Sequence, residues 1–284
     1  MAPKNKNLFK SFKLLDAKEI LPQKSDKADF SGISGIAYDK KRDILYAVSD
    51  NGLFYRLKIE LSKTKREIKR LEIVKVSRLK KSDNKPIKCK RDSDAEGLSL
   101  HPKGLLVSFE REPRVALINK KGVIKESLKL PKPLRKKSSY RKKNKMLEAV
   151  LYHPDFGVLA APELPLKGKN PKLHTIYGKK IRLHLPVSGS LTAMSLTQNG
   201  NIVVLERSFD PIFRDRKITL TLIDPKNSKS RLIAKLKSAD GYRLDNFEGL
   251  THIGDNRFLM ISDDNENPLQ KRLIALFKIK EHPL

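Results

Sequence analysis

Cysteine is almost absent from this chain of 284 residues. Cys89 is the only one, so the chain can form neither an intrachain disulfide nor a zinc site built from several cysteines. Long apolar runs are missing too: no stretch is long enough to span a membrane as a helix. The first residues lack the apolar core of a signal peptide. The sequence therefore predicts no transmembrane segment and shows no export signal, although removal of a signal peptide would leave the same sequence.

Several motifs of enzymes and RNA-binding proteins are also lacking. Aromatic residues make up 6% of the chain, and no RNA-binding aromatic motif is present. There is no glycine-rich loop that could cradle a phosphate, and the six histidines show no metal-ligand spacing. Ser190 and its neighbours lack the strand-turn-helix context of a nucleophile elbow. These absences argue against nucleotide-binding loops, histidine metal sites and serine hydrolases.

Acidic residues are few beside basic ones. The chain has 61 Lys and Arg against 32 Asp and Glu, which gives a formal net charge of +29. Such an excess indicates a polyanionic partner: nucleic acid, an acidic membrane, a phosphorylated small molecule or a cell-surface polymer. The alternative is the general basicity of some exported proteins, with no ligand involved.

Five segments of the chain repeat one plan. Each begins with a short apolar run, turns, and returns through a second apolar run that ends in a polar residue, which is typical of a β-hairpin. The equivalent starts lie 62, 52, 44 and 56 residues apart and are Ser34, Glu96, Glu148, Thr192 and Glu248. The equivalent ends follow 14 or 15 residues later and are Ser49, Glu110, Glu163, Glu206 and Ser262.

Further apolar runs extend the repeats to four strands, for example 53–61 and 71–79 after the first hairpin. Repeats of this length and content predict an all-β fold, a β-propeller with four-stranded antiparallel blades. We expect five blades, with six as the alternative; a β-sandwich would not explain a motif repeated in register. The last repeat shows three strands, so residues 8–16 are expected to supply the fourth and close the ring. We expect one propeller domain over residues 1–284, and a monomer.

The propeller fold predicts where the acidic residues gather. The first strand of each blade lines the central channel, and the connections that lead into it share one face with the turns between second and third strands. One channel mouth should therefore collect the acidic side chains of Asp50, Asp94, Glu96, Glu110, Glu148, Glu163, Glu206, Glu248, Asp263 and Asp264. Like charges raise each other's pKa, so a hard cation with oxygen ligands, Ca²⁺, is expected among them. Alternatively, each carboxylate accepts backbone N–H bonds or pairs with Arg111 or Arg207.

Two connections between blades are strongly basic. Residues 129–145 contain nine basic residues and no acidic one, and residues 77–91 are nearly as basic. Both lead into a channel strand and should border the acidic mouth. An acidic, metal-holding centre with a cationic rim suits a phosphorylated ligand, since Arg binds phosphate oxygens in pairs. The alternative is a solvated loop without a ligand.

The combination of these short motifs resembles the phytase-like family, whose name refers to esterase-like activity. The matching segments spread over roughly residues 30–280 and are 94–98, 109–111, 146–149, 205–207, 245–250 and 262–265. The resemblance implies a β-propeller, usually exported to the periplasm or secreted, with phosphoester hydrolase activity. Alkaline phytases of similar architecture use calcium ions in an acidic channel mouth to bind substrate and activate water. A cytoplasmic location stays open.

These observations lead to three functional hypotheses. The first is a calcium-assisted phosphoester hydrolase, with Glu96, Glu148, Glu206 and Glu248 as catalytic residues and Arg111 and Arg207 as substrate ligands. The second is a non-catalytic propeller that binds a polyanion or a partner protein through its basic rim. The third is nucleic-acid binding driven by charge, which should weaken steeply with salt and which we favour least.

Overall fold

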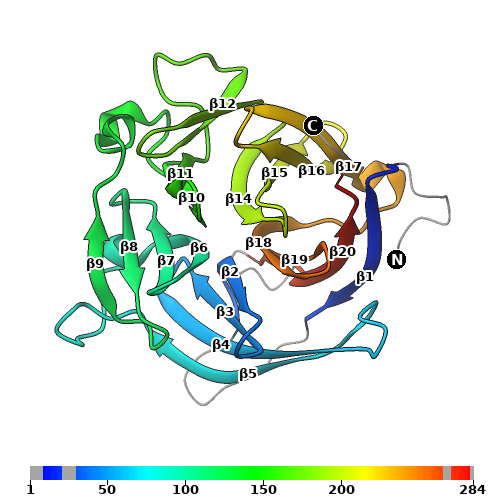
Figure 1. Ribbon diagram of the computed structural model, residues 1–284, viewed down its shortest axis with the longest axis horizontal. Helices are drawn as coiled ribbons and strands as arrows, with labels where there is room; N and C mark the ends of the chain where they lie inside the picture. The colour runs from blue at the N-terminus through cyan, green and yellow to red at the C-terminus, as the bar shows by residue number, and fades with distance from the viewer. Residues whose placement is uncertain (1–8, 21–29, 265–269, 282–284) are drawn as a thin grey trace.

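A computed structural model describes residues 9–20, 30–264 and 270–281. Within these residues, all long elements are strands, and they form five four-stranded antiparallel sheets arranged in a ring (Figure 1). The chain is therefore an all-β, five-bladed propeller, as the repeats predicted, and the six-bladed alternative is wrong. No helix in the described part of the chain is long and apolar enough to cross a membrane.

The blades follow one another in chain order around the ring (Figure 1). Blade 1 contains β2 (Ile33–Asp39), β3 (Ile44–Ser49), β4 (Leu53–Leu61) and β5 (Ile68–Arg78). Blade 2 contains β6 (Ala95–His101), β7 (Gly104–Phe109), β8 (Arg114–Ile118) and β9 (Ile124–Leu128). Blade 3 contains β10 (Leu147–His153), β11 (Gly157–Pro162), β12 (Leu173–Tyr177) and β13 (Arg182–Pro186).

Blade 4 contains β14 (Ser190–Leu196), β15 (Ile202–Asp210), β16 (Asp215–Asp224) and β17 (Lys229–Lys237). Blade 5 contains β18 (Asn246–Gly254), β19 (Arg257–Asp263), β20 (Leu273–Ile279) and the N-terminal strand β1 (Phe12–Glu19). The connections hold α1 (Lys90–Ser93) and the short 3-10 turns η1 (Lys132–Leu134), η2 (Lys137–Ser139) and η3 (Ser238–Asp240).

The N-terminal strand closes the ring. β1 pairs antiparallel with β20, from Phe12 opposite Ile279 to Glu19 opposite Leu273. The Phe12 ring also packs on Phe277, with 5.3 Å between the ring centroids. The prediction that an N-terminal strand completes the last blade is confirmed, although the strand starts at Phe12, and Leu8 lies outside the described residues.

Apolar packing between neighbouring blades forms the core. Each of the five junctions has its own cluster of buried apolar side chains. Successive strand residues face opposite sides of a sheet, so Leu105 and Val107 pack toward blade 1 while Leu106 packs toward blade 3. This alternation buries apolar residues on both faces of a blade.

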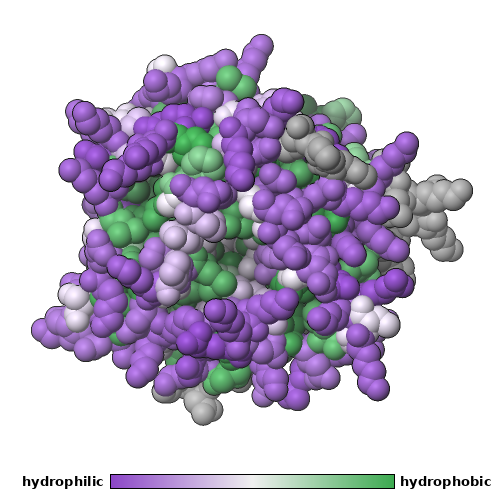
Figure 2. Space-filling view, in the orientation of Figure 1, coloured by the Kyte–Doolittle hydropathy of each residue, from purple (hydrophilic) through white to green (hydrophobic). Residues whose placement is uncertain are grey.

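The inner strands lie very close together around the axis. A Cβ atom added to Gly97 would lie 2.7 Å from the Glu148 carbonyl oxygen, and one added to Gly35 would lie 2.7 Å from the Leu98 nitrogen. Only glycine permits this approach. A cavity lined by residues near the starts of the inner strands, among them Ser34, Gly97 and Glu248, has only about 10 Å³ of free space. Hydrophilic side chains cover most of the face seen in Figure 2, with apolar ones visible around its central hollow.

Candidate metal centre at the channel mouth

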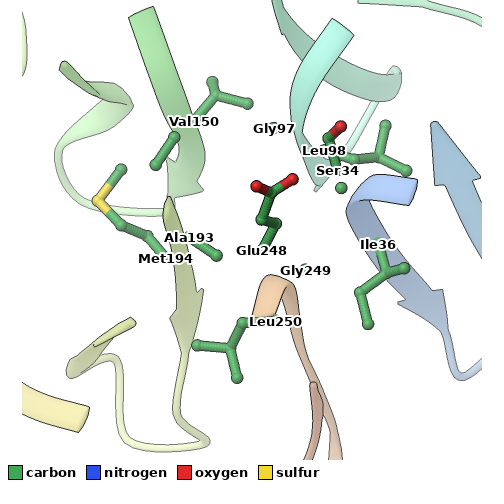
Figure 3. Close-up of a pocket in the computed structure, with 12 residues that line it drawn as sticks. Ser34, Ile36, Gly97, Leu98, Val150, Ala193, Met194, Glu248, Gly249 and Leu250 are labelled. Carbon is green, nitrogen blue, oxygen red and sulfur yellow. The ribbon is translucent and has the colours of Figure 1, made fainter. Parts of the chain in front are cut away.

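Every inner strand carries a β-bulge near its first residues. The pairing register between the first and second strands skips one residue in each blade. The bulges coincide with the five equivalent starts of the sequence repeat, Ser34, Glu96, Glu148, Thr192 and Glu248. A bulge bends the strand and redirects a side chain. Figure 3 shows the result for Glu248, whose carboxylate lies in the middle of the ring between the inner strands.

The second strands contribute one further side chain each. In each second strand, one residue pairs with the inner strand just before the bulge. The residues that follow it are Asp50, Glu110, Glu163, Arg207 and Asp263. In three of them the backbone N–H donates to a carbonyl shortly before the bulge of the inner strand. The hydrogen bonds are Asp50 to Gly32 at 3.1 Å, Glu110 to Asp94 at 2.9 Å and Glu163 to Met146 at 2.9 Å. Arg207 and Asp263 hold the same place, opposite Ser190 and Asn246. The mouth thus has four acidic positions and one arginine in this outer set.

The predicted set of equivalent ends mixes two positions: Ser49, Glu206 and Ser262 pair with the inner strand before the bulge, whereas Glu110 and Glu163 lie one residue further along. Glu206 pairs with Leu191, before the bulge, so the blade 4 counterpart of Glu110 and Glu163 is Arg207. Adjacent strand residues face opposite sides, and the Glu206 side chain is buried between blade 4 and His174 of blade 3. Its Oε1 accepts bonds from the N–H groups of Ser188 (2.7 Å) and Gly189 (3.1 Å) and lies 3.3 Å from Nε2 of the buried His174.

Five of the other predicted carboxylates form two adjoining clusters. In each, one carboxylate oxygen per residue lies within 4.8 Å of the others: Asp94, Glu96 and Glu110 in one, and Glu110, Glu148 and Glu163 in the other. Glu110 belongs to both, so blades 2 and 3 hold five carboxylates in one continuous group. Oxygen ligands at this spacing are the donor set that Ca²⁺ prefers.

Cations of the protein neutralise part of this group. Arg111 Nε lies 2.8 Å from Asp94 Oδ2, and Lys145 forms an ion pair with Glu163. Arg207 Nη2 lies 2.7 Å from Glu248 Oε1 and 3.9 Å from Glu163 Oε1. The pairing of Arg111 and Arg207 with carboxylates, which the sequence left as an alternative to phosphate binding, is what the structure shows.

Two carboxylates have no such partner. Within the described part of the chain, the carboxylates of Glu96 and Glu148 receive neither a hydrogen bond nor an ion pair, although the Glu148 residue is only 4% exposed. Burial, followed by the charges of neighbouring carboxylates, raises the pKa of both well above the usual value. Without a cation, burial and the neighbouring charges therefore favour the protonated form of these two side chains.

Glu110 and Glu248 are also perturbed. Burial raises the pKa of Glu110 to about 7, although the hydrogen bond that its Oε1 accepts from the Met146 N–H at 2.9 Å lowers the pKa. Burial likewise raises the pKa of Glu248 to about 7, opposed by Arg207. Asn246 Nδ2 also donates to Glu248 Oε1, at 2.8 Å. These two carboxylates titrate near neutral pH.

The other predicted acidic residues lie at the edge of the group. Asp264 accepts the Gly32 N–H at 3.0 Å and lies 3.2 Å from Arg272 Nε, so it joins blade 5 to blade 1. Asp263 is buried, and its charge acts on Arg207. The charge of the partly buried Asp50 contributes to the raised pKa values of Glu96 and Glu248. Asp50 and Asp263 thus belong electrostatically to the mouth.

A basic cavity of about 690 Å³ borders the acidic group. Arg111 and Met146 line this cavity and also contact the carboxylates. The other basic residues around it are Arg91, Lys137, Arg141, Lys142, Lys143 and Lys167. The connection 129–145 and the end of 77–91 therefore do border the mouth, as the sequence predicted. Lys145 and Asn246 were not singled out from the sequence, because only strand pairing shows which carboxylate each one faces.

Comparisons with known proteins agree with this fold. The sequence model of the phytase-like family, described as "Esterase-like activity of phytase", matches residues 28–266. No curated protein matches the chain. Among solved structures, the PQQ-bound aldose sugar dehydrogenase from Streptomyces coelicolor is similar, with 10% sequence identity, a TM-score of 0.50 and coverage of 98% of this chain and 100% of that one.

The WD40 domain of Pan2 from Neurospora crassa is also similar, with 10% identity, a TM-score of 0.43 and coverage of 96% of each chain. At such low identity, the likeness to the dehydrogenase concerns the fold alone. The family match is of a different kind, because it follows the sequence from blade 1 into the last blade. By this match, and by the motifs at the channel mouth, the chain belongs to the phytase-like family.

Proposed function

We propose that the channel mouth binds Ca²⁺ and hydrolyses a phosphoester of an anionic small molecule. The observation that carries this proposal is the continuous group of five carboxylates in blades 2 and 3, in which Glu96 and Glu148 have no partner among the described residues. Bringing carboxylates together without compensation costs free energy. A bound cation is the simplest compensation.

The donor set fits calcium in its chemistry. All ligands would be carboxylate oxygens of Asp94, Glu96, Glu110, Glu148 and Glu163, and hard cations with several oxygen ligands suit such a set. When bound, Ca²⁺ would polarise a phosphoryl oxygen and lower the pKa of a coordinated water. Glu206 is left out of this proposal because its side chain faces His174 rather than the mouth.

Glu248 is the carboxylate best placed to move a proton. Its contacts with Arg207 and Asn246 both use Oε1, which leaves Oε2 available to accept a proton from water. A general base works best when its pKa is near the working pH, and the pKa of Glu248 is raised to about 7. Arg207 fixes the orientation of this side chain.

The basic cavity supports an anionic substrate. Arg111 lies between the carboxylates and the cavity, so a phosphate near the carboxylates would have its remaining negative groups beside Lys142 and Lys143. Basic side chains hold such groups by charge-assisted hydrogen bonds. The same cavity favours the second candidate, a propeller that binds a polyanion without hydrolysing it.

Hydrolysis of an aryl phosphate ester by the purified protein, with calcium and with a chelator, separates the two candidates. We expect turnover with calcium only, and a loss of about 100-fold or more in Glu148→Gln, comparable to removal of an electrostatic group from an active site. Glu72→Gln, on the outer strand β5, is the matched control and should keep full activity. Calcium binding without turnover would favour the binding propeller. Turnover that ignores the chelator would contradict the proposal.

A further inference from the structure

The hairpin between β15 and β16 extends past the channel mouth. In the other blades the second strand ends at Ser49, Phe109, Pro162 or Asp263, close to the acidic positions. β15 instead continues to Asp210, and its pairing with β16 runs to Asp210 opposite Asp215. A strand rises by about 3.3 Å per residue, so the hairpin tip stands roughly 10 Å beyond the level of Arg207.

The tip presents apolar side chains to solvent. Ile212 is 84% exposed, Phe213 is 79% exposed and Phe209, on the strand below, is 55% exposed. The turn is held in place, because Asp210 Oδ1 accepts the N–H groups of Ile212 (3.1 Å) and Phe213 (3.3 Å). The two side chains are therefore displayed by an ordered turn that buries neither of them.

The tip shares its face of the propeller with two basic connections. Turns between second and third strands share a face with the connections between blades, so the tip rises from the face that carries 77–91 and 129–145. The second of these has nine basic residues and no acidic one. At the tip itself Arg214 is exposed, and the Arg216 guanidinium lies 5.4 Å from the centre of the Phe209 ring.

We propose that this face docks on an anionic lipid bilayer, with Ile212 and Phe213 inserted at the boundary between headgroups and acyl chains. Stable attachment of a peripheral protein takes two signals, commonly an apolar insertion and a basic surface. Both are present here on one face. A protein partner is the weaker reading, because a stable protein interface buries about 800 Å² on each side, while the apolar part of this surface is a single turn.

Co-sedimentation with vesicles tests the apolar signal. The full chain should bind vesicles of phosphatidylcholine and phosphatidylserine, and bind pure phosphatidylcholine much more weakly. The double variant Ile212→Gln/Phe213→Gln should lose more than about tenfold in affinity, with an unchanged melting temperature because these side chains bury nothing. The matched control is Val74→Gln/Leu232→Gln, which removes two exposed apolar side chains from the outer strands β5 and β17 and should bind like the original protein.

A second double variant and its control test the contribution of the basic residues to vesicle binding. Lys142→Gln/Lys143→Gln removes two charges from the docking face, which should weaken binding by about tenfold or more, since each basic residue near an anionic surface contributes about 1 kcal/mol. Lys226→Gln/Lys229→Gln removes two charges from the β16–β17 turn on the opposite face and should change little.

Two results would overturn the membrane proposal. One is absence of binding to phosphatidylserine vesicles, and the other is equal binding by the original protein and Ile212→Gln/Phe213→Gln. If vesicle binding is absent and the apolar variant instead abolishes self-association in light scattering, the tip is a protein contact. None of these measurements depends on calcium or on hydrolysis, so the proposed function is judged separately.

Discussion

At the scale of single residues, Glu148 and Glu163 are neighbours with opposite surroundings. Both are buried, and they share a carboxylate cluster with Glu110. Glu163 has an ion pair with Lys145 and lies near Arg207, whereas the carboxylate of Glu148 has no ion pair or hydrogen bond among the described residues. Replacing each carboxylate with an amide should therefore have opposite effects on stability.

We predict that Glu148→Gln raises the melting temperature of the calcium-free protein at pH 7 and above. Burial and nearby carboxylates raise the pKa of Glu148, so the amide reproduces the protonated form that the fold favours. A gain of about 1 kcal/mol corresponds to roughly 2–4 °C for a chain of this size. Glu163→Gln should lower the melting temperature, because Lys145 loses its partner. Calorimetry on both variants checks the prediction, and a loss of stability in both would contradict it.

Glu206 provides a test of the corrected alignment. Its Oε1 accepts two backbone N–H groups in a fully buried position, so Glu206→Ala should destabilise the protein by about 2–4 kcal/mol. Calcium affinity should stay within about twofold of the original, measured by titration calorimetry well below the melting temperature. A large loss of calcium affinity with unchanged stability would return Glu206 to the metal centre.

At the scale of elements, the ring depends on the strand that closes it. Phe12 is 5% exposed and packs against Phe277, at the point where β1 completes blade 5. Phe12→Ala should cost about 3–5 kcal/mol of unfolding free energy, while Lys13→Ala, next to it but exposed, should cost less than about 0.5 kcal/mol. Denaturant unfolding measures both. Equal effects of the two substitutions would mean that β1 adds little to closure.

The bulges explain why the sequence predicted the blades but not the alignment of every site residue. Five repeats of one hairpin pattern predicted the number of blades, the closing strand and the first position of the motif. The tripeptides 109–111 and 205–207 look equivalent because each reads apolar, Glu, Arg. Strand pairing nevertheless places Phe109 opposite Ala95, and Glu206 opposite Leu191. A shift of one residue turns a side chain to the other face, and no local pattern records where such a shift occurs.

At the scale of the whole molecule, the mouth gathers buried acidic groups within a chain of net charge +29. The contacts between Arg207 and Glu248 or between Lys145 and Glu163 join residues far apart in sequence. They arise from the arrangement of five blades, so the sequence predicted which residue types gather at the mouth and not which ones pair.

We predict that the calcium-free protein loses stability as pH rises from about 5 to 8. The pKa values of Glu110 and Glu248 are raised from 4.5 to about 7 in the folded state. The folded state then binds more protons than the unfolded state above pH 4.5, so stability falls until pH exceeds the folded pKa. Each group alone would account for roughly 3 kcal/mol. Burial raises the pKa of Asp39, but Lys120 and Arg42 lower it below the usual value. The ionisation of Asp39 therefore affects stability only at more acid pH. Melting temperatures across this range, with chelator present, check the sign; a steady rise would contradict it.

The most direct test of the metal centre is calcium titration at pH 7.5 of the original protein, Glu148→Gln and Glu72→Gln, followed by calorimetry with proton release recorded in two buffers. We expect the original protein and Glu72→Gln to bind calcium alike, to release protons as carboxyl groups of the mouth ionise, and to melt at higher temperature when loaded. Glu148→Gln should bind at least about tenfold more weakly and release fewer protons. Equal calcium affinity in all three proteins, or no binding to any of them, would show that the carboxylates of the channel mouth hold no calcium.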